Sequence, residues 1–104
     1  MYQFTPKRPN EQEVFGFDFT PQLSTGESIS TATVTASVIS GSDPSPQSIV
    51  SGAAVISKGK VSQKIIGGVD GEIYKLVCQV STTGALFPQV LEAVGSLQIT
   101  DANV

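Results

Sequence analysis

Residues 68–84, GVDGEIYKLVCQVSTTG, carry the pattern that decides the fold. On one side of this stretch, apolar or aromatic residues occupy every second position, namely Tyr74, Leu76, Cys78 and Val80. A period of two is that of a β-strand with one buried face. The glycines of GGVDG tolerate the positive φ angles of a tight connection. The stretch therefore predicts a turn followed by a strand, with the single cysteine of the chain on the inward face.

Other segments show the same two-residue rhythm, with turn residues about every 8 to 12 positions. They are EVFGFDF at 13–19, SISTATVTASVIS at 28–40, SIV at 48–50, AAVIS at 53–57, KVSQKIIG at 60–67 and QVLEAVGSLQIT at 89–100. GSDPSPQ at 41–47 is predicted to be a loop, because proline donates no amide hydrogen to a central strand. Together with the opening stretch, these segments predict seven strands.

The alternation also indicates which side chains face inward. Three phenylalanines share one face of the first segment, alanines and valines share one face of the second, and KVSQKIIG places a glutamine among apolar residues. The expected inward residues are Phe15, Phe17, Phe19, Ala32, Val34, Ala36, Val38, Val61, Gln63 and Ile65.

Seven short strands in 104 residues predict an all-β fold, an immunoglobulin-like β-sandwich with a single core. In such sandwiches, a tyrosine at the start of the next-to-last strand pins a corner through a hydrogen bond from its hydroxyl to a backbone group. Tyr74 fits this structural position. Cys78 fits a buried core position, because an unpaired cysteine packs as a small hydrophobic residue.

Composition argues against several classes of partner. The chain has 6 Lys and Arg, 9 Asp and Glu, no His and a net charge of -3. It therefore lacks the positive surplus that would attract nucleic-acid phosphates or anionic lipids. No signal-peptide pattern and no apolar run of about 20 residues is present. We expect a protein made in the cytoplasm, with no nucleic-acid, membrane or small-molecule partner.

The sequence offers no convincing reaction centre or cofactor site. Cys78 lacks a histidine base and is predicted to be buried, which argues against a nucleophile. Ser57 and Lys60 have the Ser-x-x-Lys spacing of some acyl-transfer enzymes, but in a predicted hairpin turn. GGVDG lacks the lysine of a phosphate-binding loop. Asp70 and Glu72 are too few ligands for a calcium loop. We expect no enzymatic activity, no cofactor and no metal.

The N-terminal segment has a different character from the rest. Residues 1–11 are expected to form an extended arm, and residues 12–104 the sandwich domain. Five of the seven aromatic residues lie within the first 19 positions, and exposed aromatics near a terminus are usually covered. The cover is either the arm's own sandwich or a neighbouring subunit. The candidate interface residues are Tyr2, Phe4, Pro6, Lys7, Arg8 and Pro9.

Several stretches together resemble a family of small immunoglobulin-like structural proteins of tailed phages and prophages, described as fibre-to-tail adaptors or related virion proteins. The stretches are FTPKRPNE, FDF, LSTGESISTATV, DPSP, IVSG and GGVDGEIYKLVCQVSTTG. The resemblance implies a non-enzymatic virion protein of the tail or head-to-tail region, assembled in the host cytoplasm. It implies contacts with other virion proteins and leaves a homo-oligomer open. The alternatives are a bacterial adhesin-type binding module and an accessory domain of a larger enzyme.

Overall fold

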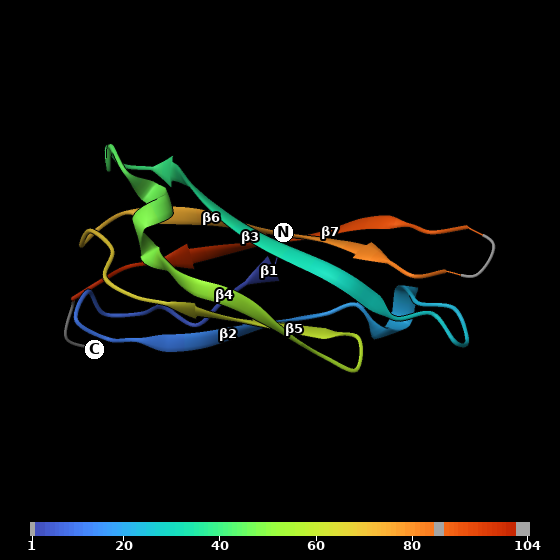
Figure 1. Cartoon of the computed structure of the whole chain (residues 1–104). Helices are drawn as coiled ribbons and strands as arrows, with labels where there is room; N and C mark the ends of the chain where they lie inside the picture. Colours follow the sequence, from blue (N-terminus) through green and yellow to red (C-terminus); the bar gives the residue numbers. More distant parts are fainter. Residues whose placement is uncertain (1, 85–86, 102–104) are drawn as a thin grey trace.

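The computed structural model describes residues 2–84 and 87–101. Two β-sheets pack face to face in an elongated body (Figure 1) with extents of 48 × 25 × 24 Å. The strands are β1 (Tyr2–Gln3), β2 (Glu13–Asp18), β3 (Ile29–Ser40), β4 (Val50–Ser57), β5 (Lys60–Ile65), β6 (Ile73–Thr82) and β7 (Val90–Gln98). Two short 3-10 helices, η1 (Thr20–Gln22) and η2 (Pro46–Ile49), lie in the connections. The predicted all-β fold is confirmed.

The four-stranded sheet has the order β1-β7-β6-β3, and the three-stranded sheet has the order β2-β5-β4. β1 runs parallel to β7, and the other neighbouring strands are antiparallel. β2 and the N-terminal half of β7 are thus edge strands of different sheets. Their open edges border the same side of the sandwich.

Seven strands are present among the described residues, but one of the predicted strands is wrong and one observed strand was not predicted. SIV at 48–50 is not a strand, because most of it belongs to η2, which begins at Pro46. Proline suits this position because its fixed φ matches the first turn of a helix. Val50 begins the single strand β4, in which the pairing with β5 is irregular between Ser51 and Val55. The seventh strand is β1, which lies in the N-terminal arm.

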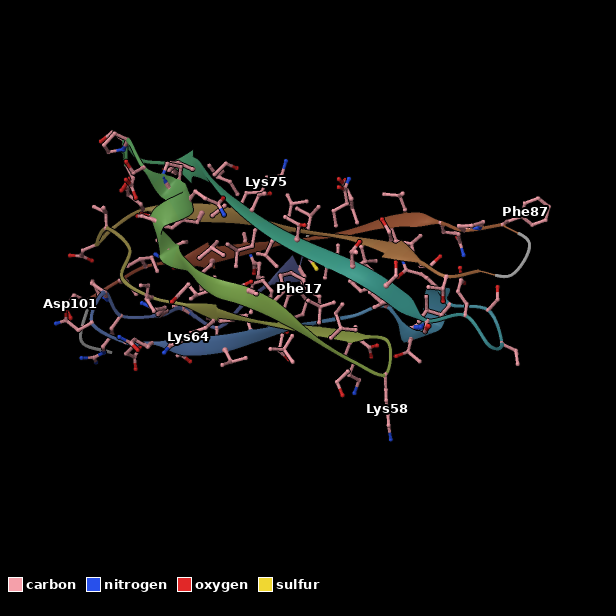
Figure 2. All side chains as sticks on the ribbon, viewed as in Figure 1. Phe17, Lys58, Lys64, Lys75, Phe87 and Asp101 are labelled. Carbon is pink, nitrogen blue, oxygen red and sulfur yellow. The ribbon has the colours of Figure 1, made fainter. Side chains whose placement is uncertain are left out.

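The predicted inward faces form the core between the sheets. The alternating phenylalanines of EVFGFDF are buried, and Figure 2 shows Phe17 between the two layers. The fully or largely buried residues also include Val34, Ala36, Val61, Ile65, Tyr74, Leu76, Cys78 and Val80, whereas Ala32 and Val38 are half-buried. Full burial of a Val, Leu, Ile or Phe side chain contributes roughly 1.5–3 kcal/mol. This face-to-face packing is therefore the main source of stability.

Two polar features complete the core. Gln63 is buried, as predicted, and its side-chain amide donates hydrogen bonds to the backbone carbonyls of Ser51 and Gly52. The side-chain amide of Gln63 thus provides hydrogen-bond donors to backbone carbonyls where the pairing between β4 and β5 is irregular. In the GGVDG connection, Gly68 has a φ of 100°, and a Cβ there would lie 2.7 Å from the side chain of Ile99. Glycine is required at this position by both conformation and space.

Candidate interaction site

The residues with Ser-x-x-Lys spacing form a hairpin turn. Ser57 and Lys60 pair with one another at the ends of β4 and β5, and Lys58 and Gly59 between them have φ angles of 49° and 82°. Two consecutive positive φ angles are those of a tight two-residue turn. Lys58 extends away from the body at the tip of this hairpin (Figure 2). The geometry differs from the helix that presents serine and lysine to each other in acyl-transfer enzymes.

Cys78 is a free, buried thiol in the centre of β6, paired with Val34 on one side and Ala93 on the other. Burial raises the pKa of its thiol to about 11. It is therefore protonated near neutral pH, and a protonated thiol is a poor nucleophile. The residues that the structure describes contain no group of three or more Cys, Asp or Glu side chains that could hold a metal ion. No helix in this part of the chain is long and apolar enough to cross a membrane.

Tyr74 lies at the corner between the GGVDG connection and β6. Its hydroxyl donates a hydrogen bond to Oδ2 of Asp43 at 2.6 Å and accepts one from the backbone N–H of Val69 at 3.0 Å. Burial and the bond to Asp43 raise the pKa of Tyr74 to about 12, and the same bond lowers the pKa of Asp43. The expected bond from the hydroxyl to a backbone acceptor is therefore corrected: the backbone partner is a donor, and the acceptor is the side-chain carboxylate of Asp43.

The N-terminal arm lies on its own sandwich, beside β7. The paired positions are Tyr2 with Gly95 and Gln3 with Ser96. Beyond this short ladder, Phe4 N–H donates to the carbonyl of Ser96 at 2.9 Å, and Lys7 N–H donates to that of Gln98 at 3.0 Å. The arm therefore follows the edge of β7 toward the C-terminal end of that strand.

Lys7 fixes the far end of the arm. Its side chain is fully buried, and Nζ donates hydrogen bonds to the carbonyl of Gly67 at 2.6 Å and to that of Arg8 at 2.8 Å. Burial lowers the pKa of this amine, and the nearby charges of Glu11 and Glu13 partly oppose that shift. A buried amine needs such acceptors because leaving it unpaired is costly. Lys7 thus contributes to the fold of its own chain.

The aromatic side chains of the arm close the side of the sandwich. The ring of Phe4 makes edge-to-face contacts with Tyr2 and Phe15 at centroid distances of 5.0 Å and with Phe17 at 5.6 Å. Edge-to-face contacts between aromatic rings stabilise the fold beyond the effect of burying their apolar area. Phe4 also lies over Gly95, where any Cβ would collide with its ring. A continuous row of rings therefore runs from the core to Tyr2, which is 66% exposed.

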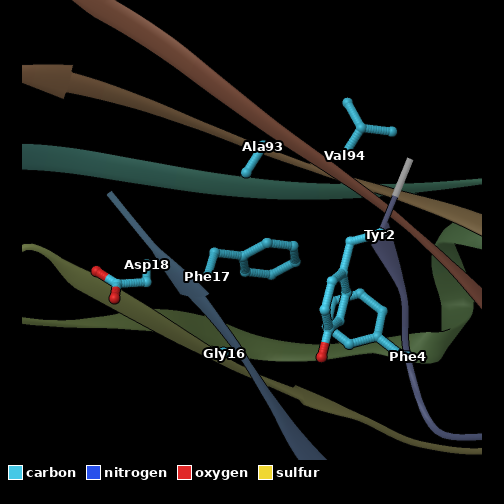
Figure 3. A pocket seen from close by; sticks show the side chains of 7 residues that line it. All are labelled: Tyr2, Phe4, Gly16, Phe17, Asp18, Ala93 and Val94. Carbon is cyan, nitrogen blue, oxygen red and sulfur yellow. The ribbon is translucent and has the colours of Figure 1, made fainter. Parts of the chain in front are cut away.

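An open groove of about 380 Å³ lies beside this row of aromatic rings, between the edges of β2 and β7 (Figure 3). We call it the edge groove. Its lining residues are Tyr2, Phe4, Gly16, Phe17, Asp18, Ala93 and Val94. The lining is mainly apolar, and Asp18 supplies a carboxylate whose pKa is lowered by hydrogen bonds from Thr20. The edge groove is suited to an apolar side chain that enters from outside.

The six candidate interface residues fall into different environments. Tyr2, Pro6 and Arg8 are exposed, Phe4 and Pro9 are intermediate, and Lys7 is buried. The packing of Phe4 on Gly95 was not predictable, because nothing in the local pattern connects two residues so distant in sequence. The same holds for Gln47, whose side-chain amide accepts a hydrogen bond from the backbone N–H of Ala36 and donates one to the carbonyl of Val34, along the outer edge of β3. Its place directly after DPSP offered no signal for that role.

Comparison with protein-family models gives a match over most of the chain. A family model described as "Podophage GP4 fiber-tail adaptor protein gp77" matches residues 7–93, which is most of the chain. Tyr2, Phe4 and the last residues of β7 lie outside the matched range. Neither the curated proteins nor the solved structures compared with the chain gave a match.

Proposed function

The chain belongs to the family of podophage GP4 fiber-tail adaptor proteins, and from this we propose that it joins two other virion proteins through separate surfaces of one sandwich. Membership in this family makes it a non-enzymatic structural protein of the phage tail that contacts other virion proteins. The observation that carries the proposal is the extent of the match, residues 7–93, over both sheets of the fold.

The first proposed surface is the side of the sandwich that carries the arm. Tyr2, Pro6 and Arg8 are exposed there, whereas Phe4 and Lys7 hold the arm in place. Exposed aromatic and arginine side chains are frequent anchors of protein interfaces. We therefore assign the contacts with a neighbour to Tyr2, Pro6, Arg8 and Pro9, and assign to Phe4 and Lys7 the role of presenting them.

The second proposed surface is the end of the sandwich that carries Phe87. Its ring is 82% exposed, and it projects from the connection between β6 and β7 (Figure 2). A depression of about 480 Å³ beside it is lined by Ser24, Thr25, Gly26, Glu27, Gly84, Phe87 and Gln89. The end with Phe87 lies opposite the end with Asp101 (Figure 2). A surface at one end and another along the side suit a protein that contacts two partners at once.

We also propose that the sandwich is immunoglobulin-like and that residues 12–104 form its domain, with residues 1–11 as the arm. The order β3-β6-β7 in one sheet and β2-β5-β4 in the other supports this, since it matches the C-F-G and B-E-D strands of immunoglobulin sheets. Tyr74 near the start of β6 supports it as well. The sandwich would then be one rigid unit that transmits force between its partners.

Reconstitution of tails tests the adaptor function. Phage tails assembled without this chain are expected to lack fibers in negative-stain electron micrographs, and adding the purified protein should restore them. Tails that keep their fibers without the chain would contradict the proposal. Sedimentation of the purified protein over a range of concentrations tests separately whether a homo-oligomer is the assembling unit.

A further inference from the structure

We propose that the open edge of β7, from Val90 to Val94, receives an extended segment of another virion protein as an added β-strand, with a large apolar side chain of that segment in the edge groove. The segment would carry Lys or Arg beside this apolar anchor. The inference rests on the adaptor function proposed above and identifies where and how one partner binds.

Along the open part of β7, alternate backbone groups point away from β6. The carbonyls of Ser96 and Gln98 accept hydrogen bonds from the arm, so the even-numbered residues of this strand direct their backbone groups away from β6. By the same alternation, Val90 and Glu92 direct their N–H and C=O groups outward. Within residues 2–84 and 87–101, no strand pairs with this edge before Gly95. An unpaired edge of this kind is a template for an additional strand.

β1 already uses the same edge of β7. It adds to β7 in parallel and directs Tyr2 and Phe4 toward the space between the sheets, but it pairs only with Gly95 and Ser96. A segment collinear with β1 would continue the same ladder toward Val90. About five residues would span that distance at about 3.3 Å per residue. The pairing of β1 with β7 is thus an example, within this chain, of the strand addition that we infer for the partner.

The edge groove offers apolar surface that a partner would cover. Leu91 and Ala93 are only partly buried along the open part of β7, and they pack against the core on the side of the groove. An apolar side chain would bury this remaining surface. Recognition by strand addition combines such pockets for side chains with hydrogen bonds between main chains. A volume of about 380 Å³ leaves ample room for one large side chain.

Charge favours another protein over a second copy of this chain. Asp18 and Glu92 lie on the two strands that border the edge groove, and its seven lining residues include no Lys or Arg. Asp18 already lies opposite Lys60 in the pairing of β2 with β5, whereas the carboxylate of Glu92 contacts the neutral amide of Gln79, so a basic side chain in the segment would complement Glu92. The chain itself has a net charge of -3, and Lys7, the lysine of its arm, is buried. Arg8 of the arm is exposed, but it follows a segment that is already paired with its own β7, so the arm of a second copy is not free to add to this edge.

The decisive variant is Glu92→Pro. Proline removes an outward N–H and obstructs strand addition, while the bonds between β6 and β7 use the odd-numbered residues. Glu92→Gln is the matched control, because it removes the charge and keeps the backbone donor. Ala93→Leu independently fills the edge groove. The probes are the purified fiber protein and the purified tail protein encoded by the same phage genome, with binding measured by calorimetry and folding by thermal melting.

We expect the wild-type chain to bind one of these two proteins through the open edge. Glu92→Pro should weaken that binding at least tenfold, Ala93→Leu should weaken it as well, and Glu92→Gln should weaken it only a few-fold. The amides of Val90 and Glu92 should exchange hydrogen more slowly in the complex. If Glu92→Pro fails to fold, the affinity of Ala93→Leu and the hydrogen-exchange measurement decide whether the partner binds at the open edge of β7.

The failures are distinguishable. If the wild-type chain binds neither protein, the adaptor function itself is contradicted. If it binds and both the Pro and Leu variants bind equally well, the function stands and the inferred binding edge is wrong. If Glu92→Pro abolishes self-association and leaves binding to the fiber and tail proteins intact, the occupant of the edge is a second copy, which also overturns the inference.

Discussion

The ring of Phe4 lies directly over the backbone of Gly95, so that any side chain at position 95 would collide with it. The two residues are 91 positions apart, and their contact joins the arm to the last strand of the sandwich. Gly95 therefore has a packing role, because its φ is not among the positive values found at other glycines of the chain. The contact also sets how far Phe4 and Tyr2 enter the space beside the edge groove.

Gly95→Ala should destabilise the protein by about 1–3 kcal/mol, the usual cost of overpacking a filled site. The reason is the displaced Phe4 ring, so Gly95→Ala in a Phe4→Ala background should cost much less. Gly16→Ala is the matched control, since a Cβ there would meet nothing nearer than the carbonyl of Val61 at 3.9 Å. Urea unfolding of the wild type, Gly95→Ala, Phe4→Ala and the double variant gives the coupling energy between the two positions. Additive effects of the Phe4 and Gly95 changes would contradict the contact.

Tyr74→Phe should lower the free energy of unfolding by about 2 kcal/mol, because it removes one hydrogen bond to a carboxylate and leaves the N–H of Val69 unpaired. The ring itself should still pack. Tyr2→Phe is the control, since Tyr2 is largely exposed and its hydroxyl makes no hydrogen bond within residues 2–84 and 87–101. Chemical denaturation measures both. Equal denaturation midpoints for Tyr74→Phe and the wild type would contradict the role of the Tyr74 hydroxyl in holding this corner of the sandwich.

Cys78 should react slowly with thiol reagents until denaturant is added, because it is buried and its pKa is raised to about 11 from 9.0. A folded-state pKa above the unfolded value means that the unfolded chain releases its proton first, so stability is lost as pH rises from about 9 to 11. The raised pKa of Tyr74 acts in the same direction from 10.0 to about 12.

Denaturation midpoints between pH 8 and about 11, compared with those of Cys78→Ala, test this sign. The variant should lose less stability than the wild type over that range. The lowered pKa of Lys7 acts in the opposite direction, since it favours the folded state as pH rises, and it is common to both proteins. Rapid labelling of native Cys78, or the same alkaline loss in both proteins, would contradict its buried position.

The faces of the strands were predictable from the sequence because a buried face imposes a period of two. Phe15 and Phe17 in β2, Val34 in β3 and Leu76 in β6 all lie inward as that pattern predicts. The pattern has limits at irregular positions. Ile29 is buried although it is out of phase with the inward residues of β3, because the register with β6 shifts between Ile29 and Thr31.

Contacts between residues far apart in sequence were not predictable in the same way. Asp43 lies in a proline-rich loop, and its bond to the hydroxyl of Tyr74 arises only when the two sheets bring that loop to the corner. Lys7 is a candidate interface residue by sequence, because lysine is rarely buried without partners. The carbonyl of Gly67, 60 positions away, provides the partner that makes its burial possible.

The N-terminal arm has a role in folding, through Phe4 and Lys7, and a proposed role in binding, through Tyr2 and Arg8. Truncation and point variants can separate these two roles. A chain from residue 12 to 104 keeps all strands of the three-stranded sheet and three strands of the other, so it should still unfold cooperatively. It should be less stable than the full chain, because it loses the contacts of Phe4 and the buried bonds of Lys7.

Tyr2→Ala combined with Arg8→Ala is the matched comparison, because both side chains are exposed and Phe4 and Lys7 stay in place. We expect this variant to melt near the wild-type temperature and to restore few fibers to deficient tails, since its neighbour contacts are gone. Melting and reconstitution are measured on the same preparations. If the truncated chain is unfolded, residues 1–11 belong to the domain. If Tyr2→Ala/Arg8→Ala restores fibers as well as the wild type, the arm serves folding alone, and the contacts lie on other surfaces such as the end with Phe87.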